Sequence, residues 1–221
     1  KTLEKNGAQQ KLLDDMQNSI DAKVAKLNEI AVERKDIENI VEYEMDDSSA
    51  NWVSTNTFIF DTRLPKLKKF IETQIQTYVD EIINPKKELN LEFFITQSWI
   101  FKVEPGGYLT RHDHPNSLLN GVFYVSTIES DKINFYDPSF STKTRIDILP
   151  ERHNVWNSTL CSINVHDNKL LLFPSWLEHS VNVNPMSNSD RISISFNVFV
   201  RGNVSEKENI SGYTLFNKLH S

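Results

Sequence analysis

The chain has 221 residues, enough for one domain of ordinary size, and carries 24 Lys and Arg against 30 Asp and Glu, a formal net charge of −6. The basic residues form no stripe, which argues against nucleic acid as the main partner, because phosphate binding requires clustered Lys and Arg. No apolar run approaches the roughly 20 residues that cross a bilayer, and the first residues show no signal-peptide pattern. The single cysteine, Cys161, rules out an internal disulfide framework and favours a reducing cytoplasm.

Two amphipathic stretches precede residue 90. Apolar residues recur at three- and four-residue steps through residues 8–44, which predicts a helix packed on the body of the protein. A dimerising coiled coil, and with it a homo-oligomer, is the alternative, although the heptad is not sustained. A second such pattern predicts a helix over about 63–83, which Asn84-Pro85 ends because proline disfavours helical geometry in the preceding residue.

The part of the chain after residue 90 reads as strands and turns without intervening helices. Alternating or continuous apolar runs predict strands over 93–103, 119–126, 132–136, 159–165, 169–173, 179–183 and 190–200. About eight strands predict a jelly roll, or double-stranded β-helix, behind supporting helices: an all-β core in a mixed α+β chain. We divide the chain into an N-terminal helical segment (1–48), a linker strand and supporting helix (49–90), a jelly-roll catalytic core (91–202) and a C-terminal tail (203–221).

Three histidines are candidate metal ligands. Because side chains on a strand alternate between its faces, we expect His112 and His114 to point the same way and Asp113 to point opposite. Two imidazoles on one face can chelate a borderline divalent metal, but such a pair alone is a weak signal. His179 follows a buried strand and a tight turn, at the start of the next strand. Taken alone, a histidine there is more often a hydrogen-bonded structural residue.

The strand over 190–200 has two different faces. Its even positions are apolar from Ile192 onward, whereas its odd positions are Arg191, Ser193, Ser195 and Asn197. A polar inner face suits a barrel whose interior holds a polar ligand; a solvated face of an edge strand is the alternative. Arg191 and Ser193 lie on the same face and could together bind a carboxylate, because arginine offers a planar pair of donors and serine adds a hydroxyl.

Taken together, four segments resemble a family of 2-oxoglutarate/iron(II) oxygenases known mainly from bacterial and phage proteins. The resemblance covers roughly residues 93–200, and it rests on these runs: His112-Asp113-His114-Pro115-Asn116-Ser117, Asn120-Gly121-Val122-Phe123-Tyr124-Val125, Phe173-Pro174-Ser175-Trp176-Leu177-Glu178-His179-Ser180-Val181 and Arg191-Ile192-Ser193-Ile194-Ser195-Phe196-Asn197. The block that ends at His179 is the most specific part.

The resemblance implies an iron(II) site formed by His112, His114 and His179, with Arg191 and Ser193 holding the far carboxylate of 2-oxoglutarate. It implies a dioxygenase that decarboxylates 2-oxoglutarate to succinate and uses dioxygen to hydroxylate a C–H bond of a second substrate. The sequence does not indicate that second substrate.

The chain departs from the wider superfamily at one ligand. A carboxylate usually stands where this chain has His114. Regular strand alternation favours the three-histidine site, and a bulge that turns Asp113 inward in place of His114 is the alternative.

Three further residues are candidates for binding the cosubstrate. Trp99 and Tyr124 lie on strands that flank the expected pocket, although both could be ordinary core aromatics, and Asn197 continues the polar face of the last strand. Two other functions stay open: a cupin-like three-histidine metalloenzyme that uses no 2-oxoglutarate, and an inactive binding or structural protein. The pair Arg191 and Ser193 argues against the cupin-like enzyme, which needs no buried carboxylate site there.

Overall fold

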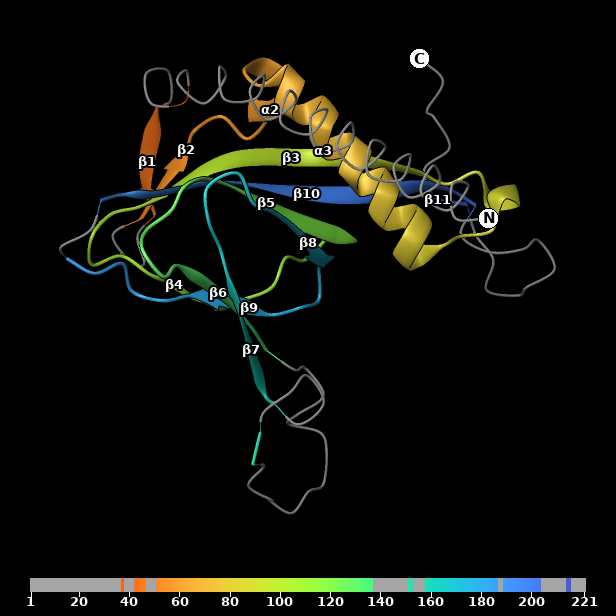
Figure 1. Cartoon of the computed structure of the whole chain (residues 1–221). Helices are drawn as coiled ribbons and strands as arrows, with labels where there is room; N and C mark the ends of the chain where they lie inside the picture. The colour runs from red at the N-terminus through yellow and green to blue at the C-terminus, as the bar shows by residue number, and fades with distance from the viewer. Residues whose placement is uncertain are drawn as a thin grey trace, which may run out of the picture.

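The computed structural model describes residues 37, 42–46, 51–136, 151–152, 158–186, 189–203 and 214–215, which form two antiparallel β-sheets (Figure 1). The large sheet has the strand order β1 (Tyr43–Asp46), β2 (Asn51–Ser54), β3 (Glu92–Val103), β10 (Arg191–Asn203), β5 (Leu119–Ser126) and β8 (Leu170–Pro174), and β11 (Thr214–Leu215) pairs with β10. The small sheet has the order β4 (Leu109–His112), β9 (His179–Val181), β6 (Lys132–Tyr136) and β7 (Leu160–Asn164). Four strands of the large sheet, β3, β10, β5 and β8, face these four, which confirms the predicted jelly roll.

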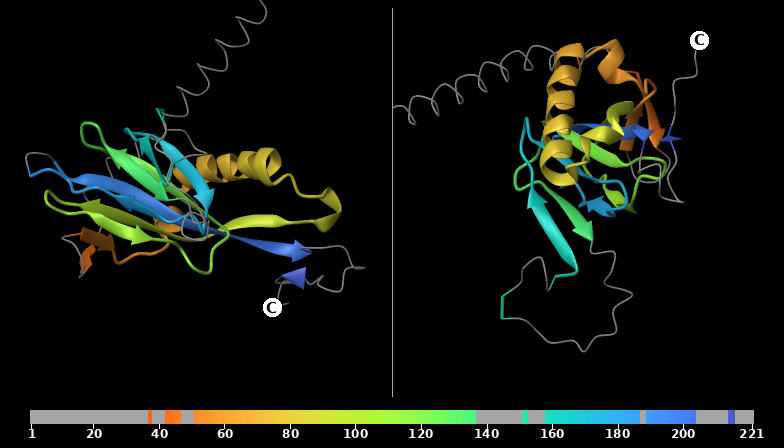
Figure 2. Two further views of the ribbon diagram at one scale, coloured as in Figure 1. Left: turned by 90° about the horizontal axis from the view of Figure 1, so that it is seen from below. Right: turned by 90° about the vertical axis from the view of Figure 1, so that its right-hand side faces the viewer.

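Helices cover the outer face of the large sheet, away from the small sheet (Figures 1 and 2). The covering elements are α2 (Ile59–Thr62), α3 (Pro65–Tyr78) and the π-helical turn η1 (Val79–Ile83), and the short 3₁₀ turn η2 (Lys87–Leu89) follows in the connection to β3. Together they confirm the predicted helix over 63–83, with Pro65 in the first turn, where its missing N–H costs nothing. The helical stretch ends at Asn84, which is left-handed with φ 45°.

The long N-terminal helix that the sequence predicts lies mostly outside the described residues. Ile37 is helical and buried in the core beneath the helices. The prediction was wrong at Tyr43 and Glu44, which belong to β1 and pair with Ser54 and Val53 of β2. A neighbouring strand supplies backbone hydrogen-bond partners there, and this tertiary contact overrides the local helical pattern. Within the described part of the chain, no helix is long and apolar enough to cross a membrane.

The central strand β10 separates two environments. Ile194, Phe196 and Val198 are fully buried in the core that the helices cover. Arg191, Ser193 and Ser195 face the space between the two sheets, where they line a cavity. The polar odd positions are therefore the inner face of a central strand, not the solvated face of an edge strand.

The contact between Gly121 and Phe196 should be intolerant of added volume. Gly121 on β5 pairs with Phe196 on β10, and a Cβ at Gly121 would lie 2.0 Å from Cζ of the Phe196 ring. We predict that Gly121→Ala lowers the free energy of unfolding by about 1–3 kcal/mol through overpacking. Chemical denaturation of the two proteins measures the loss. Adding Phe196→Leu to the variant should recover part of it, and no recovery would show that the ring is not the obstacle.

Candidate functional site

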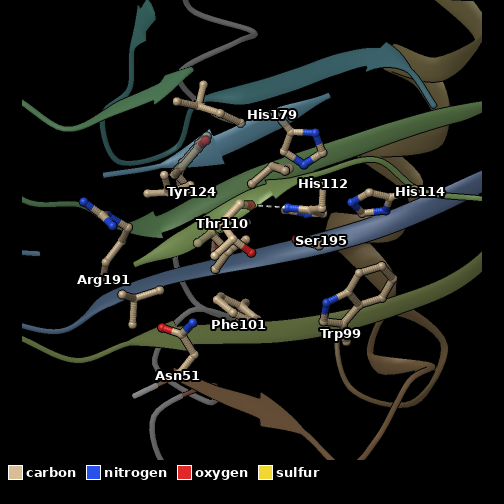
Figure 3. Close-up of a pocket in the computed structure, with 16 residues that line it drawn as sticks. Asn51, Trp99, Phe101, Thr110, His112, His114, Tyr124, His179, Arg191 and Ser195 are labelled. Carbon is tan, nitrogen blue, oxygen red and sulfur yellow. Dashed lines mark hydrogen bonds between the residues drawn. The ribbon is translucent and has the colours of Figure 1, made fainter. Parts of the chain in front are cut away.

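Three histidine side chains meet between the sheets (Figure 3). His112 ends β4 and His179 begins β9, and the two residues are paired in register. His114 follows two positions after His112, and one ligand nitrogen from each ring lies within 4.8 Å of those of the other two. The ring centroids of His112 and His179 are 4.3 Å apart, and those of His114 and His179 are 5.2 Å apart. This arrangement can hold one metal ion.

Each of the three rings has its Nδ1 occupied by an oxygen acceptor. The contacts are His112 Nδ1 to the Thr110 carbonyl at 2.8 Å, His114 Nδ1 to Asn197 Oδ1 at 3.0 Å and His179 Nδ1 to the Leu177 carbonyl at 3.1 Å. Because carbonyl and amide oxygens only accept hydrogen bonds, each Nδ1 carries the proton. The lone pair of each ring is therefore on Nε2. The Nδ1 hydrogen bonds also hold each ring in one orientation, as a metal ligand requires.

Burial keeps two of the histidines neutral. His179 is 3% exposed, and burial, reinforced by repulsion from His112, lowers its pKa from 6.5 to about 4. Burial also lowers the pKa of His114, although the hydrogen bond that its Nδ1–H donates to Asn197 opposes the shift. An unprotonated imidazole is the form that binds a metal, so both rings are in the ligand form at neutral pH.

The structure brings His114, rather than Asp113, to the other two histidines. Asp113 is exposed and does not join the cluster. However, regular alternation is not the reason, because β4 shifts register before His112 and ends there. His114 lies beyond the strand, where its backbone N–H donates to the carbonyl of Ser175 at 3.2 Å. Its ring stacks on Trp99 with centroids 6.0 Å apart, so tertiary contacts direct it inward.

The histidines close one end of a cavity of about 210 Å³ between the sheets. Its lining includes His112, His114, His179, Trp99, Phe101, Thr110, Val122, Tyr124, Ile133, Val181, Asn51, Arg191, Ser193 and Ser195. Arg191 lies at the end opposite the histidines (Figure 3). It is 4% exposed, and its Nε donates to Oδ2 of Asp131 at 2.7 Å.

The predicted cosubstrate residues occupy different places. Trp99 and Tyr124 line the cavity together with Arg191 and Ser193. Burial raises the pKa of the Tyr124 phenol, so its hydroxyl stays protonated and can donate. Asn197 is not among the lining residues; it contacts the site through its hydrogen bond to His114. The prediction that Asn197 contacts the cosubstrate therefore gives way to a role in holding His114.

Sequence reasoning missed Asp131 and the carbonyl of Thr110. Asp131 precedes β6, and no motif marks it as a partner of Arg191, because only the folded barrel brings the two together. The Thr110 carbonyl belongs to the backbone, which leaves no side-chain signal.

The donors present at each end fit a metal and a dicarboxylate. Three neutral imidazole nitrogens suit a borderline divalent ion such as iron(II). At the other end, a buried guanidinium beside serine and tyrosine hydroxyls suits a carboxylate, because each group can donate a hydrogen bond to a negatively charged oxygen.

Residues 97–197, which include all three histidines, Arg191 and Ser193, match a protein family described as "Putative 2OG-Fe(II) oxygenase". This match supports the 2OG-Fe(II) oxygenase family for this segment of the chain. The family match and the histidine cluster together support iron(II) as the metal and 2-oxoglutarate as the cosubstrate. The activity that they indicate is that of a 2-oxoglutarate-dependent oxygenase, with dioxygen as the other cosubstrate.

Several solved structures have a similar fold. An oxidoreductase of the 2OG-Fe(II) oxygenase family from Burkholderia pseudomallei aligns with TM-score 0.51 and 8% identity, over 76% of this chain and 76% of that one. HygX from Streptomyces hygroscopicus, with nickel and 2-oxoglutarate bound, aligns with TM-score 0.50 and 11% identity, over 76% and 78%. A prolyl hydroxylase from Trichoplax adhaerens aligns with TM-score 0.52 and 12% identity, over 79% and 78%. At these identities the likeness shows the fold alone. No curated protein matches the sequence.

The histidine cluster predicts one divalent metal ion per chain. His179→Ala should abolish the binding of iron(II), manganese(II) or cobalt(II), because it removes the most buried of the three nitrogens. Equilibrium dialysis with metal analysis, performed without oxygen for iron, measures the stoichiometry. His166→Ala is the matched control, since His166 is exposed and distant from the cluster in the described structure. Wild-type stoichiometry in His179→Ala would contradict the site.

The position of Asp113 predicts a clear ranking of two neighbouring variants. His114→Ala should cost far more metal affinity than Asp113→Ala, because only His114 lies within reach of the other ligands. His114→Asp should retain more affinity than His114→Ala, since a carboxylate can replace the imidazole as a ligand. Competition with a metal-binding dye measures all three dissociation constants. The reverse ranking of the two alanine variants would place Asp113 on the metal.

The lowered pKa of His179 predicts how pH affects the stability of the metal-free protein. Between about 6.5, the ordinary pKa of histidine, and about 4, its pKa in the folded chain, only the unfolded chain binds this proton. The free energy of unfolding should therefore fall as pH drops through this window, by about 1.4 kcal/mol per pH unit from this residue. Denaturation of wild type and His179→Gln across the window tests this. The slope should be shallower in the variant, and identical slopes would refute the assignment.

Proposed function

We propose that this protein is an iron(II)/2-oxoglutarate-dependent dioxygenase that decarboxylates 2-oxoglutarate to succinate and hydroxylates a C–H bond of a second substrate. One observation carries the proposal: a single cavity has three imidazole rings with their Nε2 lone pairs available at one end and a buried guanidinium at the other. 2-Oxoglutarate has complementary chemistry, with a 2-oxo acid group that can chelate a metal and a second carboxylate at its far end.

The histidines, the polar residues at the far end and one aromatic residue of the cavity have distinct roles in this proposal. His112, His114 and His179 hold the metal through Nε2, and the metal supplies the activation of dioxygen when it is bound. Arg191 and Ser193 hold the far carboxylate. The Tyr124 hydroxyl, protonated because of its burial, donates a further hydrogen bond to the cosubstrate. Trp99 packs against His114 and forms the adjacent wall, which keeps the ring in place and limits access of water.

The three-histidine ligand set gives the metal end of the cavity an unusual charge. Neutral imidazoles leave a divalent ion with its full +2 charge, whereas a carboxylate ligand would offset one unit. A dianionic cosubstrate therefore balances the ion completely. The chain contributes geometry and charge, and the walls formed by Phe101, Val122 and Ile133 keep the site shielded.

Proteins with a similar fold catalyse several different 2-oxoglutarate-dependent reactions. SnoN, a 2-oxoglutarate-dependent epimerase of nogalamycin biosynthesis, has a similar fold with TM-score 0.54 and 10% identity, over 80% of this chain and 76% of that one. Hydroxylation is the proposal because hydroxylases are prominent among the proteins of similar fold, including prolyl hydroxylases from Trichoplax adhaerens and Pseudomonas putida. Formation of succinate from 2-oxoglutarate in the presence of iron(II) would distinguish any 2-oxoglutarate-dependent reaction from that of a cupin-like enzyme.

Removal of Arg191 should weaken 2-oxoglutarate binding strongly. Truncating one partner of a buried charge pair costs about 2–5 kcal/mol, so Arg191→Ala should raise the dissociation constant about 30-fold or more. Arg191→Lys should restore part of the affinity, because an ammonium keeps the charge but lacks the planar pair of donors. Ser193→Ala should cost about 1–2 kcal/mol. Calorimetric titration of 2-oxoglutarate into the anaerobic, manganese-loaded proteins measures all four.

The control for this series lies on the same strand. Arg201→Ala removes a partly exposed arginine of β10 that pairs with Glu92 and does not line the cavity, so it should leave 2-oxoglutarate affinity unchanged. Metal stoichiometry should be normal in every variant. Undetectable binding to the wild type, together with no succinate formed from 2-oxoglutarate in the presence of iron(II), would overturn the proposal in favour of a cupin-like enzyme or an inactive protein.

A further inference from the structure

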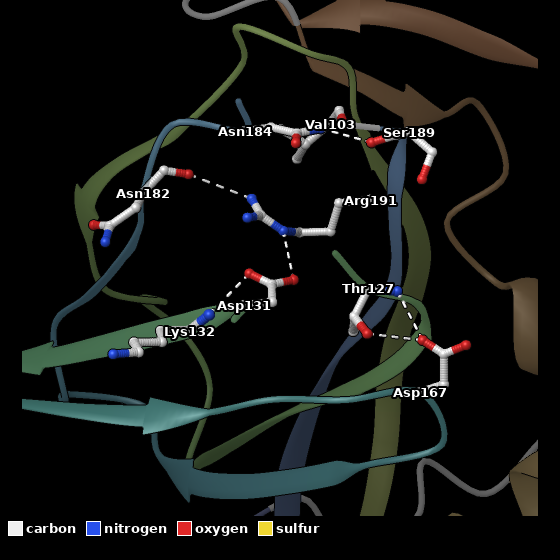
Figure 4. A network of polar contacts seen from close by, with 9 residues as sticks. All are labelled: Val103, Thr127, Asp131, Lys132, Asp167, Asn182, Asn184, Ser189 and Arg191. Atoms are coloured by element: carbon white, nitrogen blue, oxygen red, sulfur yellow. Dashed lines mark hydrogen bonds and ion pairs between the residues drawn. The ribbon is translucent and has the colours of Figure 1, made fainter. Parts of the chain in front are cut away.

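A buried ion pair lies behind the Arg191 end of the cavity (Figure 4). The side chains of Arg191 and Asp131 are 5% and 1% exposed, and Nε of Arg191 lies 2.7 Å from Oδ2 of Asp131. Asp131 does not line the cavity. Its hydrogen bond into the site is the one to Arg191, and its charge also acts on the buried phenol of Tyr124, whose pKa it helps to raise.

The contact uses one particular edge of the guanidinium. Asp131 binds Nε, and the only other contact among the described residues is a long one, 3.4 Å, from Nη1 to the carbonyl of Asn182. No oxygen of the described residues binds Nη2. Because the guanidinium is planar, fixing Nε also fixes the direction of both terminal nitrogens. These are the donors that a carboxylate in the cavity would need.

The carboxylate of Asp131 is itself held rigidly. Its Oδ1 accepts the backbone N–H of Lys132 at 2.9 Å, which leaves Oδ2 for the arginine. The backbone of Asp131 is tied on both sides, because its N–H donates to Ile128 and its carbonyl accepts from Val165. Asp131 is thus a fixed acceptor rather than a mobile surface acid.

The pair also sets the charge that the protein itself gives to the cavity. Apart from the histidines and the protonated phenol of Tyr124, Arg191 is the only ionisable side chain among the described lining residues, and Asp131 neutralises it. A buried guanidinium without a counter-charge is costly, so Asp131 lets Arg191 stay in place when no cosubstrate is bound. In a site with a carboxylate metal ligand, one negative charge is at the metal; here it lies behind the arginine.

We propose that Asp131 is a positioning residue for the cosubstrate: it holds Arg191 by Nε so that the terminal nitrogens face the far carboxylate of a dicarboxylic 2-oxo acid. This inference rests on the proposed function. It predicts that Asp131 affects only ligands that carry a second carboxylate. A merely structural role would weaken all ligands of the cavity alike.

Two ligands and two substitutions isolate this role. The ligands are 2-oxoglutarate and 2-oxopentanoate, which has the same 2-oxo acid group and chain length but no far carboxylate. Asp131→Asn removes the charge but keeps an oxygen acceptor for Nε, whereas Asp131→Ala removes both. Glu92→Ala is the matched control, because Glu92 of β3 pairs with Arg201, a partly exposed arginine on the strand that also carries Arg191. Each protein is loaded with manganese(II) and titrated anaerobically by calorimetry.

Asp131→Asn should bind 2-oxoglutarate at least as tightly as the wild type, and Asp131→Ala at least tenfold more weakly than Asp131→Asn. The dissociation constant of 2-oxopentanoate should be unchanged in both. Equal 2-oxoglutarate affinities in the two variants, or a loss that both ligands share, would overturn the role of Asp131. If Asp131→Ala does not fold, Asp131→Glu replaces it: the longer side chain displaces the acceptor and should produce the same selective loss.

The same experiment separates the two proposals. A wild-type protein that does not bind 2-oxoglutarate would overturn the proposed function and this inference together. Wild-type binding that depends on Arg191 but not on the acceptor at position 131 would overturn the positioning role alone.

Discussion

The two faces of strand β10 lie in different environments, and the rest of the structure depends on which side chains point to which face. Its outward side chains, among them Ile194 and Phe196, are buried beneath the helices, and its inward side chains Arg191 and Ser193 line a polar cavity. Because the side-chain period of a strand is two, a slip of one residue would exchange the two sets. The packing of Phe196 against Gly121 opposes such a slip, so the hydrophobic core fixes the place of the cavity arginine.

The metal ligands depend on a second layer of contacts. Each histidine reaches the cavity with its Nδ1 already bound to an oxygen, and those oxygens come from a strand backbone, a turn and the side chain of Asn197. Asn197 belongs to β10, as Arg191 does. One strand therefore positions both ends of the cavity: it holds the ring of His114 at one end and carries the guanidinium at the other.

The local sequence pattern was sufficient to predict much of this structure. Strand alternation over 190–200 predicted which residues face inward, and the amphipathic pattern over 63–83 predicted the covering helix. Contacts between distant segments were not predictable. Tyr43 pairs in a strand despite the helical sequence pattern that leads up to it, and Asp131 meets Arg191 only because the turn before β6 lies beside the start of β10. His114 was placed inward for the wrong reason, since its strand ends before it.

The edge position of β4 links the site to the order of the small sheet. Among the described strands it pairs only with β9, through Leu109 with Val181 and His112 with His179. An ion bound to all three histidines would connect the end of β4 to the start of β9, closing a loop that contains β5, β6, β7 and β8. Such a cross-link restricts the unfolded chain much as a disulfide does. The supply of metal would then govern how firmly this edge of the sheet is held, as well as whether the site can react.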